Sequence, residues 1–303
     1  MPYPSPEPNV THAASQQYHA RMQRVLDHID AHLDDDLSLA ALSAVAAFSP
    51  HHFHRQFAVL FGITARRYVQ LLRMKRASFK LAFRDDRSIT DIALDSGYES
   101  PEAFARAFRQ HTGQPPGEFR NEPDWAAWQA ACGPSNDIRS VLMTSSLNID
   151  QVRIVDVPAV PVAVLEHRGD PRLIGDTIRR FIAWRRQVGL PPRISRTFNL
   201  LHADPDSTPP EDYRLDLCAA TADASAPNEY GVVAGTIPGG RCAVLRQVGA
   251  SDDLRRSVHF LYAEWLPQSG EDLRDFPVFV ERISFFPDVP EHEAITDVFL
   301  PLR

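Results

Sequence analysis

The chain has 303 residues, of which 44% are hydrophobic, and a formal net charge of -7 at pH 7. This length allows two domains of ordinary size. No apolar run approaches the roughly 18 residues that a membrane span needs, and the proline-rich start has no apolar signal-peptide core, so we expect a cytosolic protein. Three cysteines without CxxC spacing, Cys132, Cys218 and Cys242, argue against a disulfide framework and a zinc ribbon.

The charge is unevenly distributed. Residues 1–120 carry 14 Lys and Arg against 13 Asp and Glu, whereas the remainder carries 18 against 26. Within the first part, residues 49–84 hold eight basic side chains and no acidic one. A basic block beside an acidic C-terminal region is typical of a surface that contacts phosphate. The alternative is a solvated face of a helix.

In chain order, residues 1–14 have the composition of a disordered segment, and a helical pattern of apolar residues follows from Tyr18 to Leu33. Residues 36–120 then repeat one pattern twice: a helix, a tight turn and a second helix. In each copy a Ser-Pro pair, Ser49-Pro50 or Ser100-Pro101, supplies an N-cap hydroxyl and a proline in the first turn. Two such units in tandem indicate two readers of DNA in one polypeptide.

Both second helices carry phenylalanines at i and i+4 that predict a small core. Those pairs are Phe53/Phe57 and Phe104/Phe108. Between the two units, residues 65–82 form one long helical pattern, with basic residues away from its apolar side. At 1.5 Å per residue this connector spans about 27 Å, which is compatible with holding two recognition helices about one turn of DNA apart.

Residues 122–147 are predicted to be a linker because they contain Pro123, Gly133 and Pro134, with a short amphipathic piece. From Asn148 onward, strands alternate with single helices. Segments 157–169 and 237–249 resemble each other, and each precedes a helix and two more strands. Two strand-helix-strand-strand halves predict one joined antiparallel sheet with both helices outside and a groove on its other face.

In the first recognition helix, His51, His54 and Arg55 lie opposite the phenylalanines. Arg55 can form a bidentate pair with guanine, and the imidazoles can contact base edges or phosphate. His51, His52 and His54 could also suggest a metal site, but no nearby Cys or third-ligand pattern completes a coordination shell, so we expect no metal and no cofactor.

The second recognition helix offers fewer base-reading groups. It exposes Glu102, Ala105, Arg106 and Arg109 opposite its phenylalanines. Glu102 would repel phosphate, and Ala105 can offer only a methyl contact. We therefore expect Arg106 and Arg109 to act mainly on the DNA backbone.

Residues 20–121 resemble the DNA-binding domain of AraC/XylS-type transcriptional activators, most specifically over SITDIALDSGYESPEAFARAFRQHTGQPPGEFR. The resemblance implies that both recognition helices face the major groove of promoter DNA, with RNA polymerase as a further partner. The predicted DNA-contacting residues in the helices and the connector are His51, His52, His54, Arg55, Arg66, Arg67, Arg73, Arg76, Glu102, Arg106 and Arg109.

Residues 148–303 resemble the GyrI-like effector-binding domain through AVLEHRG, PGGRCAVLRQVG, LYAEWLP and FPVFVERISFFPDVPEHEAITDVFLPL. Such domains bind small lipophilic or cationic molecules, for which aromatic faces and a carboxylate are suited. The candidate ligand-binding residues are Tyr262, Trp265, Phe279 and Glu281. Many relatives have Glu where Val280 stands, so either Glu281 replaces that acid or the acidic function is absent.

Together these patterns predict an all-α tandem helix-turn-helix domain and an α+β, GyrI-like domain. The expected boundaries are a disordered 1–14, a DNA-binding 15–121, a linker 122–147 and an effector-binding 148–303. The predicted function is a sequence-specific transcriptional regulator that senses a small molecule and is not an enzyme. Two alternatives are a GyrI-like hydrolase and a module that binds a protein partner, each fused to the DNA-binding domain.

Overall fold

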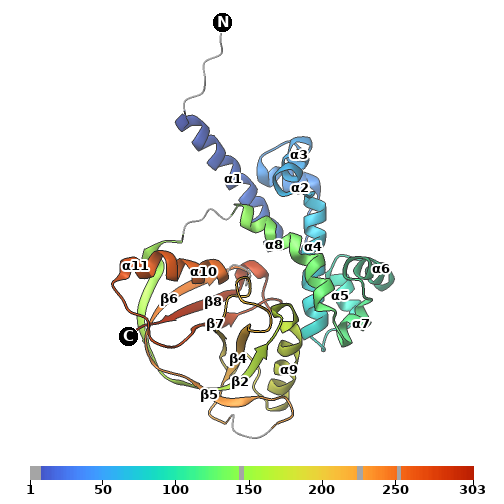
Figure 1. Cartoon of the computed structure of the whole chain (residues 1–303). Helices are drawn as coiled ribbons and strands as arrows, with labels where there is room; N and C mark the ends of the chain where they lie inside the picture. Colours follow the sequence, from blue (N-terminus) through green and yellow to red (C-terminus); the bar gives the residue numbers. More distant parts are fainter. Residues whose placement is uncertain (1–7, 143–146, 224–227, 251–253) are drawn as a thin grey trace. The chain divides into compact units, whose positions relative to one another are not determined.

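The computed structural model describes residues 8–142, 147–223, 228–250 and 254–303. The chain divides into two compact units, residues 1–145 and 146–303 (Figure 1). The first unit is helical and the second is built around one sheet. No helix within the described ranges is both long enough and apolar enough to cross a membrane.

The first unit contains two helix-turn-helix pairs joined by a long helix, α4 (Ala65–Phe83). The first pair is α2 (Leu39–Ala46) with α3 (Pro50–Phe61), and the second is α5 (Ile89–Asp95) with α6 (Pro101–Thr112). Helix α1 (Pro8–Ala31) packs against α2, and α7 (Pro116–Asn121) and α8 (Trp125–Leu142) complete the unit. The tandem repeat predicted from the sequence is confirmed.

The same local signals start and end the helices of both repeats. The hydroxyls of Ser49 and Ser100 accept a hydrogen bond from the backbone N–H of His52 and Ala103, the third residues of α3 and α6, at 3.4 and 3.2 Å. Gly62 and Gly113 end these helices with φ of 72° and 84°, which favour glycine. The four predicted phenylalanines are fully buried, so each second helix presents its opposite side to solvent.

Two predictions about the first unit differ from the structure. Helix α1 begins at Pro8, inside the segment expected to be disordered, and residues 1–7 lie outside the described residues. Its later turns are anchored in the core, and adding residues to an existing helix costs little compared with nucleating it.

Helix α8 lies in the segment expected to be a linker. Trp125 stacks on Phe83 with 5.6 Å between ring centroids, and Trp128 meets Phe79 edge-on at 5.5 Å. Farther along α8, Ile138 joins the core cluster of α1 to α4. These contacts bury apolar surface that a solvated linker would leave exposed, and they outweigh the helix-breaking composition. Helix α8 is therefore part of the helical unit.

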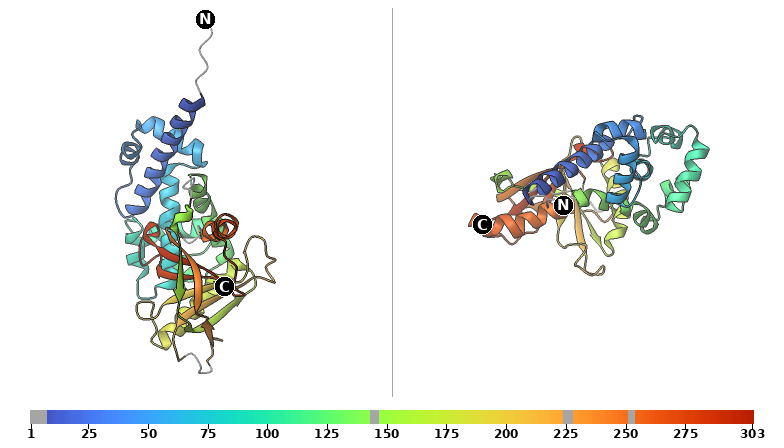
Figure 2. Two further views of the ribbon diagram at one scale, coloured as in Figure 1. Left: turned by 90° about the vertical axis from the view of Figure 1, so that its left-hand side faces the viewer. Right: turned by 90° about the horizontal axis from the view of Figure 1, so that it is seen from above.

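The second unit forms one eight-stranded antiparallel sheet, which the two views in Figure 2 show to be curved. The strand order is β1-β6-β8-β7-β3-β4-β2-β5. The strands are β1 (Val152–Val157), β2 (Val160–Arg168), β3 (Thr197–Leu201), β4 (Arg214–Ala220), β5 (Val233–Ile237), β6 (Gly240–Val248), β7 (Val278–Ser284) and β8 (Ile295–Pro301). The helices are α9 (Ile174–Gln187), α10 (Leu254–Phe260) and α11 (Leu266–Ser269), and a π-helical turn, Leu261–Trp265, joins α10 to α11.

The two predicted halves are present, as β2-α9-β3-β4 and β6-α10-β7-β8, and they meet where β3 pairs with β7. The halves also exchange a strand, which the sequence did not predict. Strand β1 leads into β2 but pairs with β6, whereas β5 leads into β6 but pairs with β2. This exchange ties the halves into one folding unit.

Helices α9 and α10 pack on the same face of the sheet. Side chains of α9 and α10 join core clusters with alternate strand residues, including Leu165 on β2 and Val280 on β7. The cluster on the opposite face consists of strand residues and Phe276, from the loop before β7. We call these the helix-covered face and the helix-free face.

Candidate nucleic-acid interface and small-molecule-binding unit

Helix α3 exposes its histidine and arginine side chains on the side opposite its buried phenylalanines. The side chains of His51, His52, His54 and Arg55 are all exposed, as predicted for groups that read DNA. The structure adds Val59, which is 87% exposed and lies one helical turn after Arg55. An exposed valine on such a helix can contact a thymine methyl group. Its spacing from Arg55 was the sequence signal that could have identified it.

Helix α6 exposes a sparser set of groups. Glu102, Arg106 and Arg109 are exposed, whereas Phe104 and Phe108 form the core on its other side. The two arginines can reach DNA phosphates as charged donors. The structure therefore presents the α6 candidates together on one side.

The basic residues of α4 divide into two groups. Arg66 and Arg67, in its first turn, are exposed, and Arg67 donates to Gln70 Oε1 at 3.1 Å. Arg73 and Arg76, farther along, are bonded within the unit. Lys75 is only 6% exposed.

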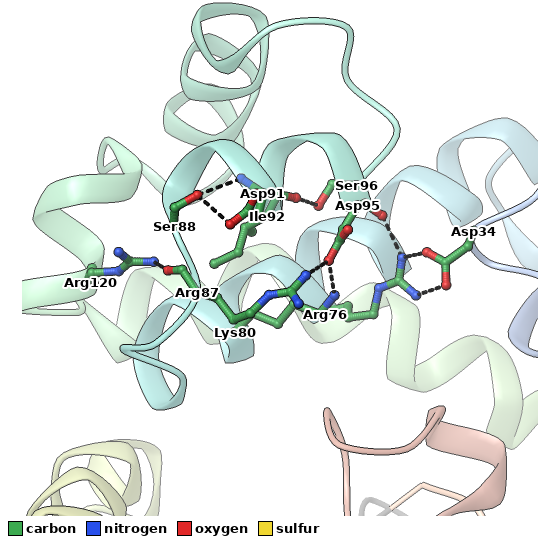
Figure 3. Close-up of polar contacts among 10 residues, drawn as sticks. All are labelled: Asp34, Arg76, Lys80, Arg87, Ser88, Asp91, Ile92, Asp95, Ser96 and Arg120. Carbon is green, nitrogen blue, oxygen red and sulfur yellow. Dashed lines mark hydrogen bonds and ion pairs between the residues drawn. The ribbon is translucent and has the colours of Figure 1, made fainter.

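The partners of Arg73 and Arg76 come from segments distant in sequence. Arg73 donates to the backbone oxygens of Leu33 and Asp35 at 3.0 and 2.9 Å. Arg76 donates to the Asp34 carboxylate at 3.0 Å and to the backbone oxygen of Asp95 at 2.8 Å (Figure 3). The basic block has no acid in its own sequence, but the fold brings acids to it. Among the basic residues of α4, only Arg66 and Arg67 in its first turn have the exposure expected of a phosphate-contacting surface.

The three cysteines are buried thiols. Burial raises the pKa of Cys132 to about 12 and also raises the pKa values of Cys218 and Cys242. A thiol with a raised pKa is a poor nucleophile at neutral pH. In the parts of the chain that the structure describes, no three His, Cys, Asp or Glu side chains are grouped so that they could hold a metal ion.

The four ligand-binding candidates of the second unit do not converge. Trp265 is 5% exposed and belongs to the core cluster of the helix-covered face together with Val280. Tyr262 is 42% exposed in the same π-helical turn, and partial burial raises its pKa. Phe279 and Glu281 alternate with Val280 along β7, so they point to the helix-free face. Glu281 therefore cannot place its carboxylate where Glu at position 280 would.

Phe279 is a core residue of the helix-free face. Its ring stacks on Phe299 with 4.7 Å between centroids and 3° between planes, and Phe198 meets it edge-on at 6.4 Å. All three rings are at most 7% exposed. Phe279 therefore packs among aromatic side chains of the sheet itself.

Glu281 is held in a two-point ion pair. Its two carboxylate oxygens accept from Nε and Nη2 of Arg196, both at 2.6 Å, and these bonds raise the pKa of the arginine. The Glu281 side chain is 10% exposed and that of Arg196 is 52% exposed. On the neighbouring strand β8, Asp297 lies opposite Glu281 and is held in the same way by Arg246 of β6, with both distances 2.7 Å. A cationic ligand would have to displace an arginine to reach either carboxylate.

A third buried carboxylate occupies the other half of the sheet. Asp216 accepts from His202 Nε2 and Arg214 Nη2, both at 2.8 Å. Burial alone would raise the pKa of Asp216, but the hydrogen bonds from His202 and Arg214 outweigh it, so the pKa lies below its usual value. This acid, too, is stabilised as an anion by partners of this chain.

Comparison with known proteins agrees with this division of the chain. Residues 150–303 match the family described as the GyrI-like small molecule binding domain, and residues 42–122 match a helix-turn-helix domain. The chain is 40% identical over 159 residues to the "Probable transcriptional regulator YgiV" of Escherichia coli (strain K12), covering 52% of this chain and 99% of that protein. It is 34% identical over 102 residues to an "Uncharacterized HTH-type transcriptional regulator" of Staphylococcus aureus (strain MRSA252), covering 34% of this chain and 14% of that protein.

Two solved structures resemble parts of the chain. One is the C-terminal domain of EcmrR, at 17% identity, with a TM-score of 0.40 and coverage of 50% of this chain and 97% of that one. The other is a regulator from Chromobacterium violaceum with an AraC-type DNA-binding domain, at 25% identity, with a TM-score of 0.33 and coverage of 37% and 96%. The assignment of the chain to a protein family rests on the two family matches. The chain belongs to the GyrI-like small-molecule-binding family and carries an AraC-type helix-turn-helix DNA-binding domain ahead of that domain.

Proposed function

We propose that the protein is a one-component transcriptional regulator and not an enzyme. Its helical unit binds promoter DNA, and its C-terminal unit binds a small molecule that changes the activity at the promoter. The observation that carries this proposal is the pair of capped recognition helices, α3 and α6, each with basic side chains exposed opposite a buried core. A regulator of this kind works in the cytoplasm with RNA polymerase as a partner.

On this proposal α3 and α6 have unequal roles at the DNA. Arg55 pairs with guanine, Val59 contacts a methyl group, and Arg106 works on the backbone. The proposed contact set is His51, His52, His54, Arg55, Val59, Arg66, Arg67, Glu102, Arg106 and Arg109. Arg73 and Arg76 are left out because both guanidinium groups already have partners in the fold.

Arg55→Ala is expected to weaken specific DNA binding more than Arg106→Ala does. Loss of one bidentate base contact costs about 1–3 kcal/mol and relaxes the preference at one base pair. Loss of a phosphate contact weakens binding to all sequences alike. Titration of both variants against the operator and a scrambled duplex at fixed salt measures the difference. Equal, sequence-independent losses would contradict the unequal roles.

We further propose that the ligand is lipophilic and uncharged and that it lies against Tyr262 and Trp265. These aromatic residues belong to a π-helical turn, a feature frequent at functional sites, and the turn lies on the same face of the sheet as Val280. Val280 is fully buried and uncharged, so that position offers no charge for a cation. Phe279 and Glu281 are assigned to the core and to the ion pair with Arg196.

The charge preference can be tested with two probes of nearly equal shape, 1-methylnaphthalene and the cation N-methylquinolinium. Thermal unfolding of the full chain is expected to move to higher temperature with the neutral probe and to change little with the cation, because only ligands bound to the folded state stabilise it. Tyr262→Ala should reduce the shift. A larger shift with the cation, lost in Glu281→Gln, would instead assign the site to Glu281.

A further inference from the structure

Two arginines of the connector α4 lie between the two helix-turn-helix pairs. Arg76 bonds to Asp34, which precedes α2 of the first pair, and to the backbone oxygen of Asp95, which ends α5 of the second (Figure 3). The Arg76 side chain is only 13% exposed, whereas that of Asp34 is 70% exposed. The guanidinium group is therefore enclosed by the fold and joins both pairs.

Arg73 makes the same kind of bridge one turn earlier. It donates to the backbone oxygens of Leu33 and Asp35, on the side of the first pair. Its guanidinium group also lies against Gly97, in the turn between α5 and α6, where an added Cβ would come within 2.8 Å of Arg73 Nη1. Gly97 has φ of 80°, a left-handed backbone conformation that favours glycine.

Asp95 makes further bonds between the second helix-turn-helix pair and α4. Its carboxylate accepts from Lys80 at 2.8 Å and pairs with Arg87 (Figure 3). Burial alone would raise the pKa of Asp95, but Lys80 and Arg87 outweigh it and lower the pKa. The end of α5 is thus bonded to α4 through both its side chain and its backbone.

Arginine is suited to this bridging. A planar guanidinium group offers five donors in a fixed fork, so it can bond to two segments at once and fix the angle between them, whereas an ammonium group acts as a point charge. Bonds to backbone oxygens at a helix end are also favoured by the helix dipole. Loss of these bonds is therefore expected to change the angle between the two helix-turn-helix pairs without removing a charge from the exposed surface.

We infer that Arg73 and Arg76 are positioning residues that set the distance and rotation between α3 and α6, so that the protein accepts one spacing of its two DNA submotifs. The inference rests on the proposed binding of DNA through both helices. One base pair inserted between two submotifs moves them apart by about 3.4 Å and rotates them by roughly 35°. A rigid protein cannot follow this change, whereas one with a loosened connector can.

The test compares wild type, Arg73→Gln/Arg76→Gln and a matched control on the same helix, Arg66→Gln/Arg67→Gln, as full chains. Binding is titrated on the selected operator and on versions with one base pair inserted or deleted between its submotifs, at several salt concentrations. Wild type should lose at least about tenfold in affinity per shifted base pair. In Arg73→Gln/Arg76→Gln this penalty should fall below about threefold, while the salt slope stays unchanged because no phosphate contact is lost.

The control should behave in the opposite way. It should keep the spacing penalty of wild type and lower the salt slope by up to about two, one for each phosphate contact. If the Gln pair does not fold, Arg73→Lys/Arg76→Lys, which keeps the charge but removes the fork, serves for the spacing test. If Arg73→Gln/Arg76→Gln, or the Lys pair used in its place, keeps the spacing penalty of wild type, or if Arg73→Gln/Arg76→Gln lowers the salt slope, the inference is overturned. A wild type without sequence preference would overturn the proposed function itself.

Discussion

Replacing Trp125 with alanine is expected to destabilise the helical unit by about 3–5 kcal/mol, the usual cost of removing a large buried aromatic side chain. Trp125 is 5% exposed and touches three aromatic rings: Phe83, Phe119 and Trp128. Its removal would therefore open a cavity that these rigid rings cannot fill. Denaturant unfolding of the full chain, followed through the transition of the helical unit, measures the change.

The control for this prediction is Val59→Ala. Val59 is 87% exposed in the same unit, so its truncation should change the free energy of unfolding by no more than about 0.5 kcal/mol. If Trp125→Ala were as mild as the control, residues 122–147 would behave as the linker that their proline and glycine content suggested.

Phe279→Ala is expected to destabilise the C-terminal unit by a similar amount, about 3–5 kcal/mol. The ring is 2% exposed, stacks on Phe299 of β8 and meets Phe198 of β3 edge-on, at the junction of the two halves of the sheet. Its loss therefore weakens the contact between the halves in addition to creating a cavity. The unfolding transition of the C-terminal unit should shift to lower denaturant concentration with an unchanged slope.

Tyr262→Ala provides the contrast. Tyr262 is 42% exposed, so its truncation should cost well under half as much stability while weakening the binding of the neutral probe. If Phe279→Ala kept the stability of wild type but abolished binding, Phe279 would belong to the ligand site and the core assignment would be wrong.

Local signals in the sequence were sufficient to predict the helical repeat. Serine caps and first-turn prolines act within one helix, and phenylalanines at i and i+4 mark its buried side, so these signals can be recognised without knowing the rest of the fold. Helix α8 was missed for the opposite reason. Its stability comes from Phe79, Phe83 and Phe119, which lie elsewhere in the chain.

The sheet was predicted as two repeated halves, but its register was not. Strand alternation decides that Val280 and Glu281 point to opposite faces, and only the packing of Val280 against α10 and Trp265 shows which face carries the helices. For this reason the sequence grouped Trp265 with Glu281, although the structure separates them. The exchange of β1 and β5 is a long-range pairing that leaves no local signal.

The ion-pair partners of the basic residues in 49–84 were likewise not predictable from their neighbours in the sequence. Counting neighbours along the sequence gave Arg73 and Arg76 no acidic partners, but tertiary contacts supply Asp34 and the end of α5. Arg66 and Arg67 are also arginines of α4, but they are exposed. The difference between a phosphate contact and a structural bridge depends on which side of α4 meets the rest of the unit.

The most direct test of the account is selection of DNA by the full chain from a pool of random duplexes, followed by titration of the enriched sequences at fixed salt. The account predicts two short submotifs centred about 10–10.5 base pairs apart, bound at least about a thousandfold more tightly than random DNA. A pool that shows no enrichment, with binding that depends on salt but not on sequence, would contradict the claim that α3 and α6 read a promoter together.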